Sequence, residues 1–209
     1  TKIKISNLNI IRHLKPTLIL FLPQIASSIY LLLDRTMLGI ISSNSEVGFY
    51  DQAQKIIKMA LSIVTSLGIV MMPRIASTFA DKNNKKVFYY LNQAFRFVFL
   101  LSIPIMFGIM ATAKNMVPWF FGDGYETVIV LLIITSPIIV IIALSNVLGV
   151  QYLLPTLRQK EYTISIIAGA IINFCLNLVL IAKFNSLGAS LATVCAELSV
   201  TLVQFWYTR

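Results

Sequence analysis

Six apolar stretches follow one another along the 209 residues, separated by short polar connections. A helix needs about 20 mostly apolar residues to cross the hydrocarbon core of a bilayer. The pattern predicts an all-α, polytopic membrane protein with a short amino-terminal segment at residues 1–16. Its six transmembrane helices are expected at residues 17–41, 47–73, 92–113, 127–150, 163–182 and 187–207.

Prolines and glycines indicate where these helices kink and where they end. Pro23, Pro104 and Pro137 lie inside predicted spans. A proline there usually kinks the helix, because neighbouring helices can satisfy the freed carbonyl. Helix ends or turns are predicted at Pro73, Pro155, 122–124 and 186–188.

The amino-acid composition indicates that lipid is the solvent for much of the chain. Hydrophobic residues make up 57% of the sequence and charged residues 12%, whereas soluble domains carry about 25% charged residues. A soluble fold of this size could not bury so much apolar surface in one core. We therefore expect a membrane protein.

Basic residues are concentrated on one side of the predicted spans. The net charge is +9, but these residues lack the interleaved aromatics of a nucleic-acid surface, so nucleic acid is not an expected partner. Cytoplasmic loops are enriched in Lys and Arg, and the loops of one side hold only Lys114 and Lys183. The amino-terminal side has 12 of the 17 Lys and Arg: Lys2, Lys4, Arg12, Lys15, Arg74, Lys82, Lys85, Lys86, Arg96, Arg158, Lys160 and Arg209. Both ends are therefore predicted to face the cytoplasm.

Signals for catalysis or for metal binding are weak. Cys175 and Cys195 lie in apolar runs and are expected to be free buried thiols. With His13 as the single histidine, no zinc-binding spacing exists. We predict no catalytic residue, no metal site and no cofactor, and coupling to a proton or sodium gradient is left open. The chain begins at Thr1 rather than at Met, so we expect a part of a longer protein.

Polar residues follow one face of each of the first two spans. Gln24, Ser28 and Arg35 are spaced by four and seven positions, and Asp34 lies beside them. Such residues within lipid usually face a bundle interior or a wet cavity. The polar stripe of the second span comprises Asp51, Lys55, Lys58, Ser62 and Thr65. Two simpler interpretations stay open: the two lysines of this stripe snorkel to the headgroups, and Asp34 and Arg35 belong to an ion pair that fixes packing.

The last two spans also carry polar stripes. Gly169, Asn173 and Asn177 share a face of the fifth span, where small and amide residues usually hold helices together. We favour that packing role. In the sixth span, Glu197 is a carboxylate near mid-span that must be protonated, paired or hydrated. It is a candidate to carry a proton or an ion, or to pair with a basic residue of the first two spans. Its stripe comprises Ser190, Thr193, Glu197, Thr201 and Gln204.

Several motifs together resemble those of polysaccharide repeat-unit flippases. These are the Wzx-type members of the multidrug/oligosaccharidyl-lipid/polysaccharide exporter superfamily. The resemblance covers essentially the whole chain and is most specific over residues 34–77, which are similar to helices seven and eight of that family. The segments that carry it are Asp34–Gly39, Val47–Lys55, Met72–Ser77, Phe121–Tyr125, Asn146–Gln151 and Gly188–Ser190, with Glu197 after them.

The resemblance implies a function for a longer protein. Family members have two lobes around a central cavity and move undecaprenyl-pyrophosphate-linked oligosaccharide across the bacterial cytoplasmic membrane by alternating access. Six spans correspond to the carboxy-terminal lobe, whose partners would be the bilayer, the lipid-linked oligosaccharide and the missing amino-terminal lobe. Since Arg and Lys bind phosphate, we expect a cationic cavity wall. Its predicted residues are Arg35, Lys55 and Lys58, with Asp34 and Gln24 beside them.

Three alternatives remain at this point. A drug or cation antiporter of the same superfamily would favour acidic cavity residues, whereas this stripe is basic. A membrane polymerase or glycosyltransferase for lipid-linked sugars would need a large non-cytoplasmic loop with acid and base residues, and the loops here are short. A purely structural helical fragment is the third.

Overall fold

The computed structural model describes residues 21, 25, 28 and 32–209, and this part of the chain is helical with short connections. Residues 32–41 are helical and lead through a two-residue turn into α2. The helices that follow are α2 (Asn44–Ala80), α3 (Asn84–Phe121), α4 (Glu126–Thr135), α5 (Ile138–Ser145), the π-helical η2 (Asn146–Leu153) and α6 (Gln159–Thr208).

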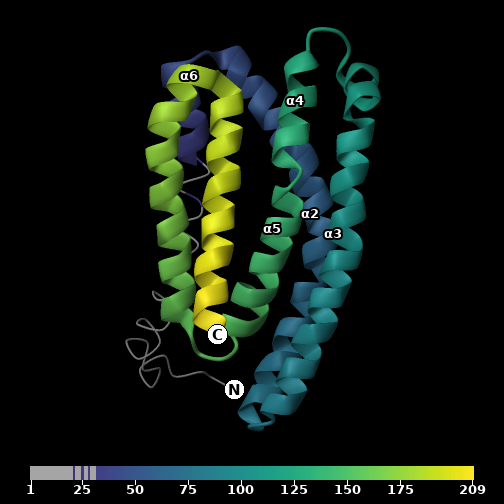
Figure 1. The fold of residues 1–209 in the computed structure, drawn as a ribbon, viewed down its shortest axis with the longest axis vertical. Coiled ribbons are helices and arrows are strands. Elements are labelled where there is room, and N and C mark those ends of the chain that lie inside the picture. Colours follow the sequence, from purple (N-terminus) through teal and green to yellow (C-terminus); the bar gives the residue numbers. More distant parts are fainter. Residues whose placement is uncertain (1–20, 22–24, 26–27, 29–31) are drawn as a thin grey trace, which may run out of the picture.

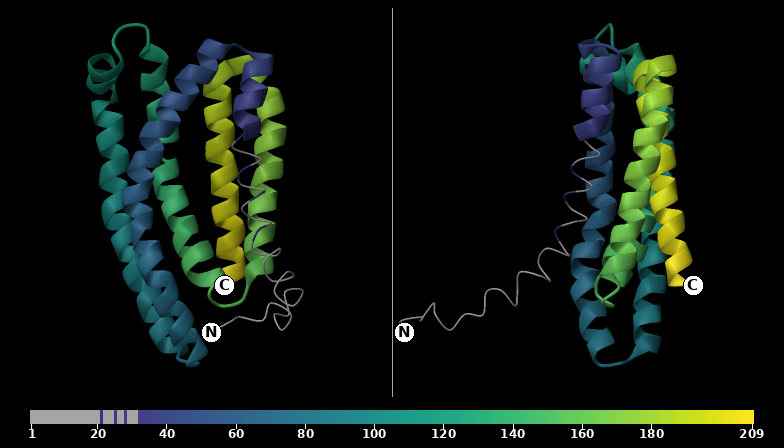
Figure 2. Two further views of the ribbon diagram at one scale, coloured as in Figure 1. Left: turned by 180° about the vertical axis from the view of Figure 1, so that it is seen from behind. Right: turned by 90° about the vertical axis from the view of Figure 1, so that its left-hand side faces the viewer.

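The helices run up and down side by side, and α6 folds back on itself (Figures 1 and 2). α2, α3, the run 126–153 and α6 are each long and apolar enough to cross a membrane. The prediction of an all-α, multi-pass membrane protein is confirmed. The count of six spans is not settled by these helices, because the first predicted span lies largely outside the described residues.

α6 is interrupted at Asn185, where φ is 52° and ψ is −129°. The break divides the element into two antiparallel limbs, 159–184 and 186–208 (Figure 1). The backbone N–H of Ser186 donates to Glu46 Oε2 at 3.2 Å, and Ser42 Oγ donates to Asn185 Oδ1 at 2.8 Å. The start of the second limb is therefore hydrogen-bonded to the turn before α2 and to the first turn of α2. The turn predicted at 186–188 was wrong in position, since those residues are helical.

The helix ends differ from the predicted span ends. α2 continues through Pro73 to Ala80, and α3 begins at Asn84, so only residues 81–83 form the turn. The helix end predicted at Pro73 was therefore wrong. The physical reason is that polarity marks where a helix leaves lipid and not where its hydrogen bonding stops. In the last turns of α2, Thr78 Oγ1 and Ser77 Oγ both donate to the Arg74 carbonyl.

The other proline and glycine predictions can be compared directly, except that Pro23 lies outside the described residues. A kink was predicted at Pro137, and the structure interrupts the helix there, with α4 ending at Thr135 and α5 beginning at Ile138. The helix end predicted at Pro155 is confirmed, since this residue follows the end of η2. α3 runs through Pro104 without ending. The turn at 122–124 is confirmed, with Gly122 at φ 81° and Gly124 at φ 90°.

Close packing of small residues brings the two limbs of α6 and the central helices together. A Cβ added at Gly169 would collide with the Val200 side chain, so this glycine lets the limbs approach as small residues do in membrane bundles. The core around α4 and α5 is apolar and includes the fully buried Leu131, Ile138 and Ile139. Cys175 and Cys195 are free but exposed. The expectation that both are buried was wrong, because they lie on outward faces of α6.

Candidate functional site

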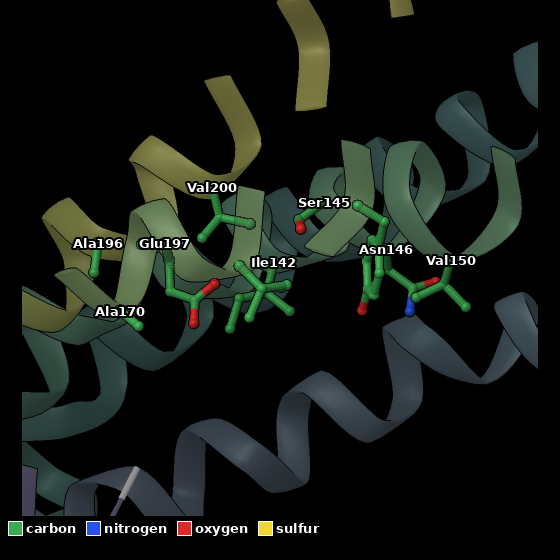
Figure 3. A pocket seen from close by; sticks show the side chains of 11 residues that line it. Ile142, Ser145, Asn146, Val150, Ala170, Ala196, Glu197 and Val200 are labelled. Atoms are coloured by element: carbon green, nitrogen blue, oxygen red, sulfur yellow. The ribbon is translucent and has the colours of Figure 1, made fainter. Parts of the chain in front are cut away.

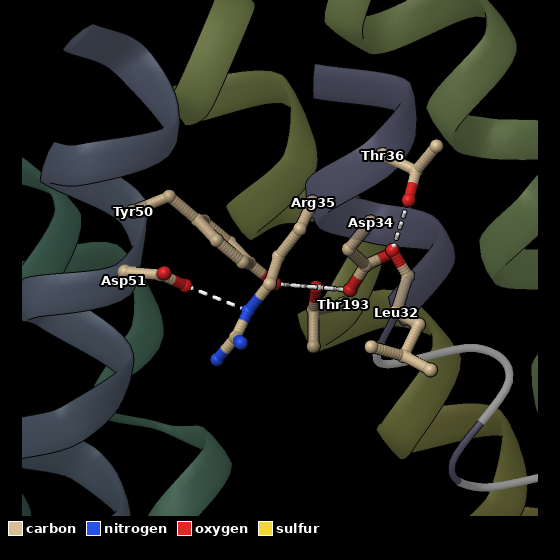
Figure 4. A network of polar contacts seen from close by, with 7 residues as sticks. All are labelled: Leu32, Asp34, Arg35, Thr36, Tyr50, Asp51 and Thr193. Carbon is tan, nitrogen blue, oxygen red and sulfur yellow. Dashed lines mark hydrogen bonds and ion pairs between the residues drawn. The ribbon is translucent and has the colours of Figure 1, made fainter. Parts of the chain in front are cut away.

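A buried polar cluster joins the segment 32–41 to α2 and to both limbs of α6 (Figure 4). At its centre lies Asp34, whose side chain is 0% exposed. Tyr50 Oη donates to Asp34 Oδ2 at 3.0 Å, and Asn177 Nδ2 donates to Asp34 Oδ1 at 2.6 Å. Thr193 Oγ1 lies 3.2 Å from Asp34 Oδ2 and 3.0 Å from Tyr50 Oη. Four separate stretches of sequence therefore converge on one carboxylate.

Several oxygen atoms gather around this carboxylate. Asn177 Nδ2 also contacts Asn173 Oδ1 at 3.1 Å, and Thr193 Oγ1 donates to the Ala189 carbonyl at 2.8 Å. Asn177 Oδ1 and Asn173 Nδ2 have no hydrogen-bond partner within the described part of the chain. Carboxylate, amide, carbonyl and hydroxyl oxygens are the ligands that hard cations prefer. The described residues contain no cluster of three or more His, Cys, Asp or Glu that could hold a metal.

Arg35 turns away from this cluster and pairs with α2. Its Nε lies 2.7 Å from Asp51 Oδ1, and the two side chains are 41% and 27% exposed. Figure 4 shows Nε facing Asp51 and the two Nη nitrogens turned away from Asp34. Arg35 and Asp34 are therefore not paired with each other, and among the described residues Asp51 is the acidic partner of Arg35. A guanidinium held through Nε can still present two parallel N–H donors to an anion.

Lys55 and Lys58 lie on the same exposed side of α2, one and two turns beyond Asp51. Neither makes an ion pair or hydrogen bond with another described residue, and the buried positions of α2 lie on its opposite face, including Ile57 and Val64. At 1.5 Å per residue, Lys58 is about 21 Å along the helix from its start.

The hydroxyls that continue this stripe serve the helix itself. Ser62 Oγ donates to the Met59 carbonyl and Thr65 Oγ1 to the Leu61 carbonyl. Both donors are thus satisfied locally, which leaves Arg35, Lys55 and Lys58 as the charged donors of this face in the described part of the chain. Gln24, the remaining predicted wall residue, lies outside the described residues.

Glu197 lines a cavity of about 210 Å³ between α5, η2 and both limbs of α6. Ser145 and Asn146 also point into this cavity (Figure 3), and Tyr162 closes one side. Nearby, Ser145 Oγ donates to Gln204 Oε1 at 2.9 Å, and Gln151 Nε2 donates to Asn146 Oδ1 at 3.0 Å. The cavity follows the start of η2, and π-helical turns are frequent at functional sites.

The sequence predicted only some of the residues that form the cluster around Asp34. Asn173 and Asn177 were interpreted as helix packing, Thr193 was named only as a member of the polar stripe of the sixth span, and Tyr50 was not singled out. The carboxylate of Asp34 could have indicated these partners, because an acidic residue within lipid requires hydrogen-bond donors. The polar stripes of the last two spans supply such donors in their amide and hydroxyl side chains.

The chain was compared with known protein families and proteins. Residues 2–130 match the family described as polysaccharide biosynthesis protein. The chain belongs to this family. It is 26% identical over 208 residues to the putative O-antigen transporter of Escherichia coli, a match that covers 100% of this chain and 50% of that protein.

Two further relatives are flippases by name. The lipid II flippase MurJ of Bacillus subtilis is 27% identical over 155 residues, which are 73% of this chain and 28% of that protein. A probable low-salt glycan biosynthesis flippase of Haloferax volcanii is 23% identical over 167 residues, which are 78% of this chain and 34% of that protein. The chain therefore spans half or less of the length of each of these relatives.

A solved structure shows the same fold. The outward-facing conformation of a multidrug resistance MATE family transporter of the MOP superfamily superposes with a TM-score of 0.79. The match covers 91% of this chain and 43% of the transporter, at 17% sequence identity. The family match and the named relatives confirm the resemblance to polysaccharide flippases that the motifs predicted.

Proposed function

We propose that this chain is the carboxy-terminal, six-span lobe of a flippase for undecaprenyl-pyrophosphate-linked oligosaccharide. Support comes from family membership, from relatives named as O-antigen transporter and flippases, and from a fold shared with a two-lobe superfamily. The test is restoration of surface polysaccharide in a flippase-deficient bacterium by the full-length protein. The proposal is contradicted if the protein reaches a normal level in the membrane but restores no surface polysaccharide in any of several flippase-deficient strains with different repeat units.

The observation that carries this proposal is the free cationic face of the segment 32–41 and α2. A pyrophosphate and its sugars cannot cross hydrocarbon without a polar path. Arg35, Lys55 and Lys58 offer donors on one exposed side, and only Arg35 has an acidic partner among the described residues. We infer that this face lines the central cavity opposite the other lobe, where it replaces the lost hydration of the pyrophosphate.

The proposed orientation places the turn at 81–83 in the cytoplasm and the loop at 122–125 outside. In the described part of the chain, eight of the basic residues counted for the cytoplasmic side lie at one end of the bundle: Arg74, Lys82, Lys85, Lys86, Arg96, Arg158, Lys160 and Arg209. Such an excess favours the cytoplasm. Lys114 and Lys183 lie toward the opposite end, near Gly122 and Asn185.

We expect Asp123→Cys, in a full-length background without native cysteines, to react with a membrane-impermeant maleimide in intact cells. Asn84→Cys should react only after permeabilisation. Both positions are exposed, Asn84 as the first residue of α3 and Asp123 in the turn after α3, so access and not burial decides the outcome. Labelling of Asn84→Cys but not of Asp123→Cys in intact cells would reverse the orientation.

We further propose that Asp34 is the site at which a coupling cation acts. Asp34 is fully buried, its described donors are neutral, and the adjacent Arg35 is engaged by Asp51. A buried carboxylate is stable only when it is protonated, paired or bound to a cation. Because the cluster joins three helices, loading and release of the cation would change how the segment 32–41 packs on α6.

Glu197 is proposed as a second titratable residue in the same transport cycle. Its carboxylate lines a mostly apolar cavity between α5, η2 and both limbs of α6, where Ser145 and Asn146 are its polar neighbours. We expect Glu197→Gln, which keeps shape and hydrogen bonding, to flatten the dependence of export on external pH. The measurement is export across a pH series in a flippase-deficient cell, normalised to membrane protein. An unchanged pH profile at normal activity would assign Glu197 to packing alone.

A further inference from the structure

An apolar groove opens at the basic end of the bundle, away from the cationic face of α2. It has a volume of about 200 Å³ and lies between the start of α3, the end of η2 and the end of α6. Aromatic rings form much of its wall, and the rings of Phe88 and Tyr152 are 6.5 Å apart. The residues that line it are Phe88, Leu91, Asn92, Phe95, Leu148, Tyr152, Phe205 and Thr208.

Basic side chains surround this groove. The Arg209 guanidinium carbon lies 5.4 Å from the centre of the Phe205 ring, which lines the groove. On α3, Lys85 precedes Phe88 by three positions and Arg96 follows Asn92 by four, so both share the helical stripe that faces the groove. Lys85 and Arg96 are exposed.

Acidic residues are scarce on the elements that form the groove. Neither α3 nor η2 contains Asp or Glu, and at this end of α6 the nearest carboxylate to Phe205 in sequence is Glu197, eight positions earlier. Glu161, at the start of α6, is already paired with Arg158 at 3.2 Å. The elements that line the groove therefore bring more basic than acidic side chains to its rim.

We propose that this groove binds one acyl chain of an anionic phospholipid of the bilayer, whose headgroup is attracted by the basic residues Lys85, Arg96 and Arg209 around it. An apolar, aromatic-walled slot fits a lipid tail, and each nearby Lys or Arg attracts an anionic headgroup. An aromatic belt at the membrane interface would explain the aromatic residues. It would not explain why they form a groove or why basic side chains outnumber acidic ones around it. The site is separate from the proposed substrate path, because it uses α3, η2 and α6 and not the exposed side of α2.

The experiment measures lipids retained by the purified full-length protein, by native mass spectrometry after exchange into mixed micelles of phosphatidylglycerol and phosphatidylcholine. The wild type should retain phosphatidylglycerol in preference. Arg96→Gln with Arg209→Gln should lower that retention about ten-fold. Lys114→Gln with Lys183→Gln, which removes the same charge at the opposite end, is the matched control and should leave it unchanged.

A second variant tests the groove itself. Asn92→Trp fills the slot without removing a charge, so retention should fall while the melting temperature stays near that of the wild type. Equal retention of the two lipids by the wild type, or equal loss in the control, overturns the proposal. Displacement of phosphatidylglycerol by undecaprenyl pyrophosphate, abolished in Asn92→Trp, would instead make the groove a substrate site and also overturns it.

Discussion

Export of surface polysaccharide should fall at least about a hundred-fold when Arg35, Lys55 and Lys58 are all replaced by alanine in the full-length protein. Each position offers a charge-assisted hydrogen bond, and loss of one costs roughly 1.5–3 kcal/mol, or about ten- to a hundred-fold in binding. The readout is polysaccharide restored in a flippase-deficient cell, normalised to protein in the membrane. Lys114→Ala, an exposed lysine on α3, is the matched control and should export normally.

Single substitutions separate charge from geometry on this face. Lys58→Arg should retain much of the activity, whereas Lys58→Gln should lose most of it. Arg35→Lys should be impaired, because a lysine that pairs with Asp51 has no second nitrogen to offer, while Arg35 pairs with Asp51 through Nε and leaves both Nη nitrogens outside this ion pair. If the lysines instead snorkel to the headgroups, Lys58→Gln should export at a near-normal level. Normal export by the triple alanine variant at equal protein level would reduce these residues to topology and packing.

Asp34→Asn should abolish the dependence of transport on its coupling cation. The substitution keeps volume and hydrogen bonding in the buried cluster but removes the only carboxylate among the described residues that Tyr50, Asn177 and Thr193 contact. We expect export to fall at least about ten-fold, since hydrogen bonds to charged groups are worth roughly 1.5–3 kcal/mol. If the cation is sodium, NaCl should raise the Tm of the purified wild type above that in KCl, and Asp34→Asn should remove the difference.

Tyr50→Phe is the matched control for this prediction. It deletes one donor to Asp34 in the same cluster and keeps the carboxylate, both asparagines and the Ala189 carbonyl. Its membrane level should resemble that of the wild type, and the sodium response should persist. A wild type whose Tm ignores sodium but whose export stops when the proton gradient is collapsed would identify the cation as a proton. Normal export by Asp34→Asn would exclude a coupling role for Asp34.

Apolar periodicity located the membrane crossings but not the helix ends. The predicted spans 47–73 and 92–113 lie within α2 and α3, which extend beyond them by several residues on a polar helical hairpin. The predicted span 127–150 is one crossing built from α4, α5 and η2. Hydropathy indicates which residues contact lipid. It therefore does not detect that a helix continues into water, or that it changes from α-helical to π-helical pitch at Asn146.

The site was predictable at the level of single polar residues but not of their partners. Helical spacing placed Asp34 beside Arg35 and put Asp51, Lys55 and Lys58 on one stripe. It could not show that Arg35 pairs with Asp51, whereas Asp34 turns inward to Asn177, 143 positions away. Adjacent residues on a helix point about 100° apart, so the choice of side depends on how the helices pack.

Reconstitution tests the central claim most directly. The full-length protein in liposomes would be given an undecaprenyl-pyrophosphate-linked oligosaccharide, and the fraction of headgroups accessible to an external glycosidase would be followed over time. We predict that the wild type makes the inner-leaflet pool accessible under a cation gradient, while the Arg35, Lys55 and Lys58 triple alanine variant does not differ from empty liposomes. Equal rates for the wild type and the triple variant, or no movement by the wild type, would contradict the account.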